Sequence, residues 1–205
     1  MAFSLIVLEI DEDAPMSPAT RRADAERNRT QILAAAREAY AEQGLGASLD
    51  GIARRAGVGP GTLYRHFAGR DEVVAAILED EMVDLEREFT ELRDGDLDPD
   101  VKITRWISVL HRWMTRFDGL PDPLRVALEQ GVGRIGVRCE ETIGWTEELL
   151  AEGRRAGVVK DAVTGRDLYR AALALAWVAA STGDSSSLVV DPLHSLLRQG
   201  WRVDG

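Results

Sequence analysis

The chain has 205 residues, of which 45% are hydrophobic and 29% are charged, and its formal net charge at pH 7 is −10. These proportions are typical of a globular protein that folds in water, and they exclude a largely disordered chain. No run approaches the roughly 18–20 apolar residues that span a bilayer, and the single cysteine excludes an internal disulfide. The expected compartment is therefore the cytoplasm, and Cys139 is expected to be a small buried or half-buried residue rather than a reactive thiol.

Charge divides the chain into two parts. Residues 19–70 carry nine arginines and five acidic residues, whereas residues 71–205 carry 16 basic and 26 acidic residues. A basic segment attached to an acidic body predicts that a polyanion is attracted to one end of the protein and repelled by the other.

The first predicted segment is an N-terminal extension, residues 1–20. Its opening "MAFSLIVLEIDEDAP" contains a short apolar run that follows no basic residue and precedes acidic residues instead of a small-residue cleavage site. This order argues against a secretory signal. The extension is expected to be disordered, or to result from misplacing the start of translation at Met1 instead of Met16.

Three helices are predicted next. Residues 24–44 repeat apolar side chains on one helical face and end at a glycine. Ser48 suits the N-cap of a short second helix, which Gly57 ends, and Pro60 suits the first turn of a third helix.

Helical periodicity continues through the acidic part of the chain, and no alternating run is longer than four residues. The sequence therefore predicts an all-α fold without a sheet. The further helices are expected over residues 71–93, 101–117, 123–130, 135–156, 166–180 and 191–203.

The second and third helices have the pattern of a helix-turn-helix. Two short helices can cross closely only if the residues in the turn between them are small. Ala56 and Gly57 meet this requirement. A miniature core is expected from the apolar residues Ile52, Ala53, Val58, Leu63 and Phe67. The other residues of the third helix are polar or small, which is what entry into the major groove of DNA requires.

The stretch "SLDGIARRAGVGPGTLYRHFAGRDEVV" resembles the DNA-binding signature of the tetracycline-repressor (TetR) family of transcriptional regulators. The departures are Arg70, where lysine is usual, Val73 and Val74, where leucine is usual, and the pair Ala68-Gly69. The resemblance implies a helix-turn-helix DNA-binding domain over residues 21–70 and a helical ligand-binding and dimerisation domain over residues 71–205.

The resemblance also implies roles for single residues. Ser48 would hold a phosphate at the N-terminus of the second helix, and Thr62 would face base edges with the backbone around Gly59 and Gly61. Arg65 would reach a guanine or a phosphate. Contacts to the DNA backbone, which fix the register of the protein without reading sequence, are expected from Tyr64, His66 and Arg70. Arg21 and Arg22 are expected on a flexible arm that enters a minor groove.

Several of these assignments have plain alternatives. The alternative for Tyr64 is that it only packs on the first helix. For Arg21 and Arg22, a solvated tail is expected as much as a groove contact. Arg54 and Arg55 are expected to point outward and to attract the DNA electrostatically, without contacting particular groups. A metal site at His66 is not expected, because no acidic or histidine ligand accompanies it at a suitable spacing.

In the body, the resemblance implies a helical bundle around a pocket, with the last two helices forming a four-helix bundle with a second subunit. The apolar stretch "RDLYRAALALAWVAAS" and the leucines of "DPLHSLLRQGW" agree with a homodimer, because such faces are unstable in water. A two-fold dimer would present two recognition helices to a palindromic operator.

The pocket is expected to bind an apolar or aromatic small molecule. An ordinary helical core is the alternative explanation for the same side chains. His111 or Arg105 would supply the few polar contacts that such a ligand needs, although exposure at the surface is the favoured expectation for both. The candidate ligand-binding residues are Trp106, Leu110, Trp113, Met114, Phe117, Trp145 and Trp177.

No nucleophile with a base, no metal cluster and no phosphate-binding loop can be assembled from the sequence, so neither an enzyme nor a cofactor is expected. The favoured hypothesis is a ligand-responsive regulator, released as a repressor from a palindromic operator. A transcriptional activator would have the same DNA-binding and effector-binding domains, so the sequence does not separate it from a repressor. The alternative is a helical protein that binds or sequesters a small molecule and carries a vestigial DNA-binding head.

Overall fold

The computed structural model describes residues 18–131, 133–182 and 187–203. The expectations for residues 1–17 lie outside this part of the chain. The described residues form nine helices and no strand, with one isolated bridge between Val159 and Arg202, so the all-α prediction is confirmed. The helices are α1 (Pro18–Gln43), α2 (Leu49–Arg55), α3 (Pro60–His66), α4 (Arg70–Asp94), α5 (Pro99–Met114), α6 (Pro121–Gln130), α7 (Gly133–Arg155), α8 (Gly165–Thr182) and α9 (Ser187–Trp201).

Two helices begin at least four residues earlier than the sequence predicted, whereas α4 to α8 begin only one or two residues earlier. α1 begins at Pro18 instead of Asp24, because a proline is well suited to the first turn and the following residues are mostly good helix formers. Residues 18–20 therefore belong to a helix and not to an extension. α9 begins at Ser187, so that Pro192 lies inside the helix.

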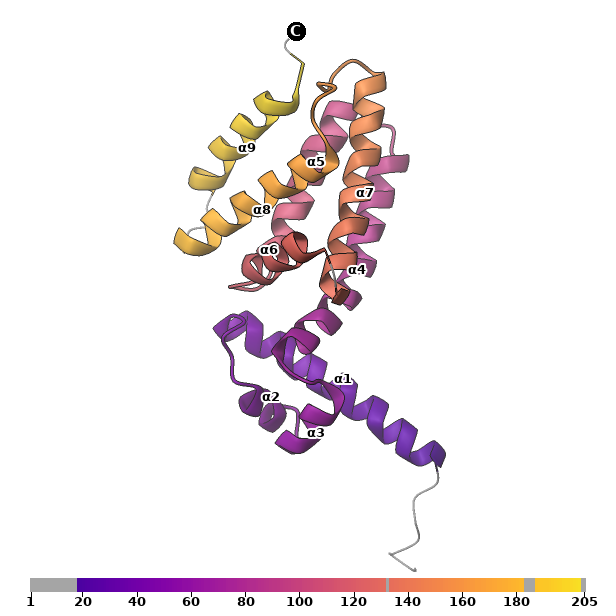
Figure 1. The fold of residues 1–205 in the computed structure, drawn as a ribbon, viewed down its shortest axis with the longest axis vertical. Coiled ribbons are helices and arrows are strands. Elements are labelled where there is room, and N and C mark those ends of the chain that lie inside the picture. The colour runs from indigo at the N-terminus through magenta and orange to yellow at the C-terminus, as the bar shows by residue number, and fades with distance from the viewer. Residues whose placement is uncertain (1–17, 132, 183–186, 204–205) are drawn as a thin grey trace, which may run out of the picture.

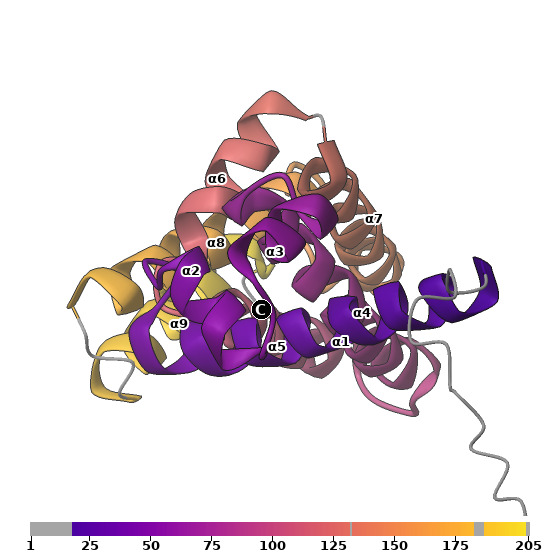
Figure 2. The ribbon, with the colours of Figure 1, turned by 90° about the horizontal axis from the view of Figure 1, so that it is seen from below.

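The helices are arranged in two groups (Figure 1). α1, α2 and α3 form a small group at one end, which we call the head, and α4 leads from it into the larger group of α4 to α9, which we call the body. Seen from below, the head lies across the end of the body and the first turns of α1 project beyond it (Figure 2). No helix within the described segments combines the length and the apolar character needed to cross a membrane.

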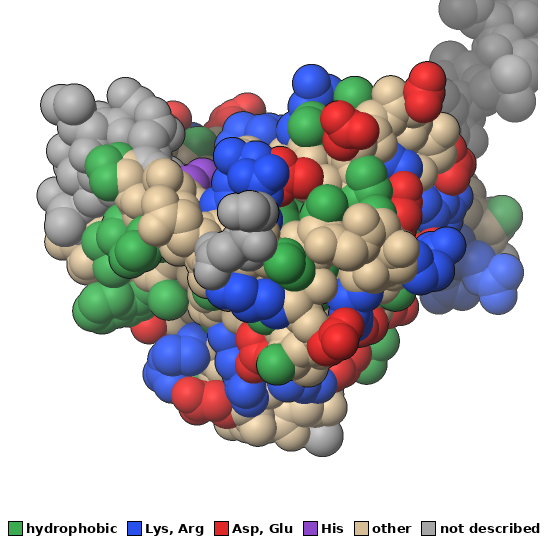
Figure 3. All heavy atoms as spheres, turned by 90° about the horizontal axis from the view of Figure 1, so that it is seen from above, with side chains coloured by type: hydrophobic (Ala, Val, Ile, Leu, Met, Phe, Trp, Pro, Cys, Tyr) green, Lys and Arg blue, Asp and Glu red, His purple; other side chains and the backbone are tan. Residues whose placement is uncertain are grey.

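Each group has buried apolar side chains. In the head, Ile52, Leu63 and Phe67 are buried against Ile32 of α1. In the body, α5 lies against α4, α7 and α8, and its Trp106 and Leu110 are completely buried. The opposite end of the molecule from the head carries interspersed acidic and basic side chains, with a hydrophobic patch to one side (Figure 3).

The head and the body are joined through the loop after α5. The N–H of Leu45, just after α1, donates a hydrogen bond to the main-chain oxygen of Asp118 at 2.8 Å. Beside this bond, the rings of Tyr40 and Phe117 meet edge to face with their centres 6.3 Å apart. Gly44 ends α1 with a φ of +67°, and an added Cβ there would lie 3.0 Å from the same Asp118 oxygen. The contact between the head and the body therefore depends on the close approach of the backbone at Gly44 to the backbone at Asp118.

A buried lysine joins three helices of the body. The Lys102 ammonium donates to the main-chain oxygen of Arg93 at 2.8 Å and to a carboxylate oxygen of Glu152 at 2.9 Å. Its side chain is almost fully buried, so both contacts are made largely out of water. The end of α4 is thereby tied to α5 and α7.

Cys139 is buried, as expected, and accepts a hydrogen bond from the Tyr169 hydroxyl at 3.3 Å. Burial raises the pKa of the Cys139 thiol. A raised pKa disfavours the nucleophilic thiolate, which agrees with a structural role.

Candidate nucleic-acid interface

The turn between α2 and α3 has a defined hydrogen-bond pattern. The N–H of Val58 donates to the oxygen of Ala53 at 3.0 Å, and the N–H of Gly57 donates to the oxygen of Arg54 at 3.1 Å. Gly57 has a φ of +71°, a conformation that favours glycine. These features form a Schellman motif, which ends α2 sharply and sets the direction in which α3 begins.

The start of α2 is capped as predicted. Ser48 adopts an extended conformation and its hydroxyl oxygen accepts a hydrogen bond from the N–H of Gly51 at 3.4 Å. The residue is exposed, so its hydroxyl group is accessible from solvent. An anion placed there would meet both this hydroxyl and the positive end of the helix dipole.

The outward side of α3 combines small residues with hydrogen-bonding side chains. An added Cβ at Gly59 or Gly61 would meet nothing within 4 Å, so both positions border open space. The Arg65 guanidinium donates to the Thr62 hydroxyl at 2.8 Å. This bond holds two predicted base-contacting side chains together on one surface.

Tyr64 and His66 flank this surface. Tyr64 is 50% exposed, which separates it from the buried neighbours Leu63 and Phe67 and argues against a role confined to packing. His66 is half-buried beside the ring of Phe67, with the two ring centres 6.4 Å apart. Both side chains therefore lie at the edge of the exposed surface of α3.

Three arginines differ from their expected environments. Arg21 and Arg22 are exposed, but they lie in the first turns of α1 and not on a flexible arm. Arg70 is half-buried at the start of α4, and its Nη1 atom is buried without a hydrogen-bond partner in the part of the chain that the structure describes. Burial raises the pKa of the Tyr40 phenol, and the positive charge of Arg70 opposes this rise in part, so the two side chains interact electrostatically.

Contrary to expectation, the Arg55 side chain is paired with acidic residues of the protein instead of being free to attract DNA. Its two terminal nitrogens donate to the Glu42 carboxylate at 3.0 and 2.7 Å, and Glu38 lies 3.7 Å away. The hydrogen bond to Glu42 raises the pKa of Arg55 and lowers that of Glu42. The pair joins α2 to α1 and neutralises one positive charge of the head.

The predicted ligand-binding residues do not surround one cavity. Trp106, Leu110 and Met114 are completely buried. The Trp106 indole donates to the Thr146 hydroxyl at 2.9 Å. Trp145 is half-buried and packs in the same aromatic cluster, 6.5 Å from Trp106 between ring centres. These four side chains are core residues in this conformation.

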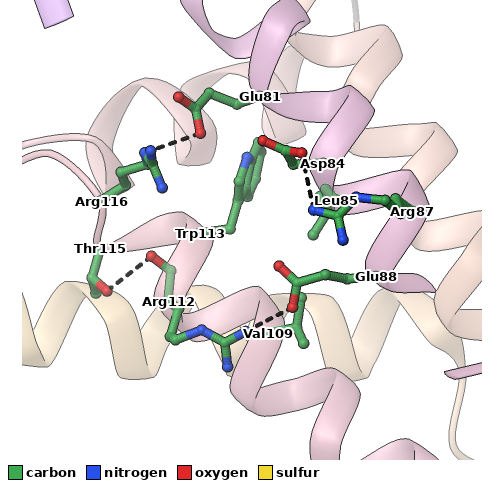
Figure 4. A pocket seen from close by; sticks show the side chains of 10 residues that line it. All are labelled: Glu81, Asp84, Leu85, Arg87, Glu88, Val109, Arg112, Trp113, Thr115 and Arg116. Atoms are coloured by element: carbon green, nitrogen blue, oxygen red, sulfur yellow. Dashed lines mark hydrogen bonds and ion pairs between the residues drawn. The ribbon is translucent and has the colours of Figure 1, made fainter. Parts of the chain in front are cut away.

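The other three predicted residues lie apart from that core. Phe117 belongs to the joint with the head. Trp177 is 52% exposed and lines a groove of about 800 Å³ between α6 and α8. Trp113 is buried and lines a different cavity of about 430 Å³ between α4 and α5 (Figure 4).

The cavity between α4 and α5 has polar walls that the sequence reasoning missed. Arg116, in the turn after α5, contacts Glu81 of α4 at 3.0 Å, and Arg112 of α5 contacts Glu88 of α4 at 2.7 Å, so the two ion pairs lie on either side of Trp113 (Figure 4). The signal was present as acidic residues seven apart on one helix and arginines four apart at the end of the next helix and just after it. Only the pairing of the helices shows that they face each other.

His111 also differs from expectation, because it is buried with an exposure of 8%. Burial lowers its pKa, and the nearby ring of His194 lowers it further. Within the described residues, no group of three or more histidine, cysteine or acidic side chains could hold a metal ion.

Known proteins resemble both the head and the whole chain. Residues 32–77 match the family described as "Bacterial regulatory proteins, tetR family". The HTH-type transcriptional regulator SrpR of Pseudomonas putida is 42% identical over 153 residues, which make up 71% of this chain and 66% of SrpR. The chain thus spans just under two thirds of that relative's length.

Solved structures agree in fold. The crystal structure of the TetR transcriptional regulator SCO0520 from Streptomyces coelicolor is 26% identical, with a TM-score of 0.55, over 86% of this chain and 99% of its own. FadR from Bacillus subtilis, solved in complex with stearoyl-CoA, is 21% identical, with a TM-score of 0.61, over 83% of this chain and 98% of its own. The likeness to FadR concerns the fold alone.

Proposed function

Because the chain belongs to the TetR family of bacterial regulatory proteins, we propose that it is a dimeric transcriptional regulator, acting as a repressor that a small molecule releases from its operator. The observation that carries the proposal is the exposed outward surface of α3, where Arg65 and Thr62 are already joined beside two glycines. In this proposal the DNA-binding domain comprises residues 21–70, and the effector-binding and dimerisation domain comprises residues 71–205. The protein works in the cytoplasm, where it meets DNA.

In this proposal α3 enters the major groove. Thr62 and the backbone at Gly59 and Gly61 approach base edges, and Arg65 contacts a guanine, which is the commonest specific contact of arginine. The phosphates are held by Ser48, Tyr64, His66 and Arg70. Arg70 would have to turn outward from its half-buried position to reach a phosphate.

Arg21 and Arg22 extend the interface along the first turns of α1. A helix holds their side chains at fixed positions, so they contact the DNA backbone at the flank of the half-site or the adjoining minor groove. Their contribution is electrostatic and falls as salt is added.

Two subunits associate through α8 and α9. Leu196 of α9 is 65% exposed, although large apolar side chains are usually buried. A two-fold dimer covers such faces and presents two copies of α3 to the two halves of a palindromic operator.

The effector is a small apolar or aromatic molecule. The groove between α6 and α8, with Trp177, Leu128 and Leu173 in its walls, is an apolar surface that such a molecule could bind. Binding that favours one arrangement of α4 and the joint at Asp118 changes the spacing of the two heads. Effector and operator then weaken each other's binding by the same factor.

The test is a titration of the purified protein against labelled duplex from upstream of its own gene, at several salt concentrations. Saturable binding should weaken steeply with salt, and Arg65→Ala should weaken it by about 1–3 kcal/mol, roughly 5- to 150-fold. Arg105→Ala removes an exposed arginine of the body and serves as the matched control, with little effect expected. Weak binding that is equal for any sequence, and unchanged in Arg65→Ala, would favour a ligand-binding protein with a vestigial head.

A further inference from the structure

Two histidines that are far apart in the sequence meet between α5 and α9. The rings of His111 and His194 lie perpendicular to each other, at 88°, with their centres 5.3 Å apart. His111 is buried and His194 is half-buried. The chain has only three histidines, and His66 lies in the head, so two of the three have been brought together by the fold.

The pair contains an unsatisfied nitrogen. The Nε2 atom of His111 is buried and has no hydrogen-bond partner among the described residues. A buried polar atom without a partner is costly, so its presence calls for a physical explanation such as a bound ion.

The spacing of the rings fits a shared metal ion. Zinc lies about 2.0–2.1 Å from an imidazole nitrogen, which places it about 3.2 Å from the ring centre. Two rings at a tetrahedral angle around one ion then have centres about 5 Å apart. The observed 5.3 Å agrees with this value.

We propose that His111 and His194 form a two-histidine site for a divalent transition metal such as Zn²⁺ or Ni²⁺, with water completing the coordination. Nitrogen ligands without thiolates suit these ions. Histidine side-chain atoms are visible at the surface at the end of the body opposite the head (Figure 3).

The metal fastens α9 to α5. On the same side of the bundle, Arg198 of α9 forms an ion pair with Asp100 of α5, and Arg202 lies 3.5 Å from the same carboxylate. A metal between the histidines adds a second attachment for a helix that carries part of the proposed dimer surface. The site does not depend on DNA binding, so it can be tested in the absence of an operator.

The experiment measures Zn²⁺ and Ni²⁺ binding to the tag-free, metal-depleted full-length protein by isothermal titration calorimetry near pH 7. One ion per chain should bind. At an ion concentration about 100 times the dissociation constant, the unfolding midpoint should rise by roughly 5–10 °C. His111→Gln and His194→Gln should each abolish both effects.

His66→Gln is the matched control and should bind zinc as the wild type does, since it removes the one histidine outside the pair. If His111→Gln misfolds, as judged by circular dichroism, His194→Gln decides the question because that residue is half-buried. The proposal is overturned if the wild type binds no ion, if either pair variant retains full binding, or if His66→Gln loses as much as they do.

Discussion

At the scale of single residues, Gly57 and Gly61 are glycines for different physical reasons. Gly57 has a φ of +71°, whereas Gly61 lies in α3 and borders open space. Gly57→Ala is therefore expected to lower the free energy of unfolding by about 1–2 kcal/mol, because a Cβ strains the left-handed conformation. Chemical denaturation of the purified variant measures this change.

Gly61→Ala is the matched control for stability. Alanine is favoured over glycine inside a helix, so the free energy of unfolding should stay equal or rise by up to about 1 kcal/mol. Operator binding should nevertheless weaken, because the added methyl group keeps α3 away from the base edges. Equal loss of stability in both variants would contradict the assigned backbone roles.

His111 gives a prediction for pH. The pKa of its imidazole lies below the ordinary value of 6.5 in the folded protein, so the unfolded chain takes up this proton first as the pH falls. The contribution of the neutral His111 imidazole to the free energy of unfolding is fully present above pH 6.5, and it is lost as the pH falls below that value. In the presence of a chelator, His111→Gln should lose less stability than wild type between about pH 7 and about pH 5.5. A pH dependence identical to that of the wild type would show that the His111 imidazole remains easy to protonate in the folded state.

At the scale of the helices, the two lysines of the chain provide a matched comparison. Lys102 is buried between α4, α5 and α7, whereas the Lys160 ammonium contacts main-chain oxygens of Gln199 and Gly200 at an exposed site. Lys102→Met should lower the free energy of unfolding by about 1–3 kcal/mol, since the part-buried Arg93 carbonyl and Glu152 carboxylate lose their partner. Lys160→Met should cost less than about 1 kcal/mol. Thermal or chemical unfolding distinguishes the two, and equal losses would argue against the role of burial.

Features that depend on neighbouring residues could be predicted from the sequence. The cap at Ser48, the turn at Gly57 and the periodicity of the helices are set within a few positions, so the all-α fold and the helix-turn-helix followed directly. Partners on other helices could not be predicted. Arg55 meets Glu42 across α1 and α2, and Trp106 meets Thr146 across α5 and α7, so neither contact leaves a periodic signal.

The candidate ligand residues failed to form one cavity for the same reason. A stripe of aromatic residues on a helix indicates a buried face, but it does not distinguish a packed core from the wall of a hollow. That distinction depends on how closely the facing helices approach. The polar walls between α4 and α5 likewise became recognisable only once the two helices were seen to lie side by side.

At the scale of the whole molecule, the proposed dimer can be tested with two similar exposed residues. Leu196 on α9 is 65% exposed and Val83 on α4 is 68% exposed. Leu196→Glu should shift the protein toward monomer, because a charge buried at an apolar interface has no partner, whereas Val83→Glu should leave the dimer intact. Sedimentation at several protein concentrations measures the change, and operator affinity should fall with dimer content. A dimer that persists in Leu196→Glu and dissociates in Val83→Glu would place the interface on α4 instead.

The bond between Leu45 and Asp118 has an evolutionary consequence. Both of its atoms belong to the main chain, so almost any substitution of either side chain leaves donor and acceptor in place, with proline at position 45 as the exception. Under the proposed function, mutations can therefore alter the inner surfaces of the body, and with them the effector that it binds, without removing this hydrogen bond to the head. New effector specificities would then arise while the connection between effector binding and DNA binding is kept.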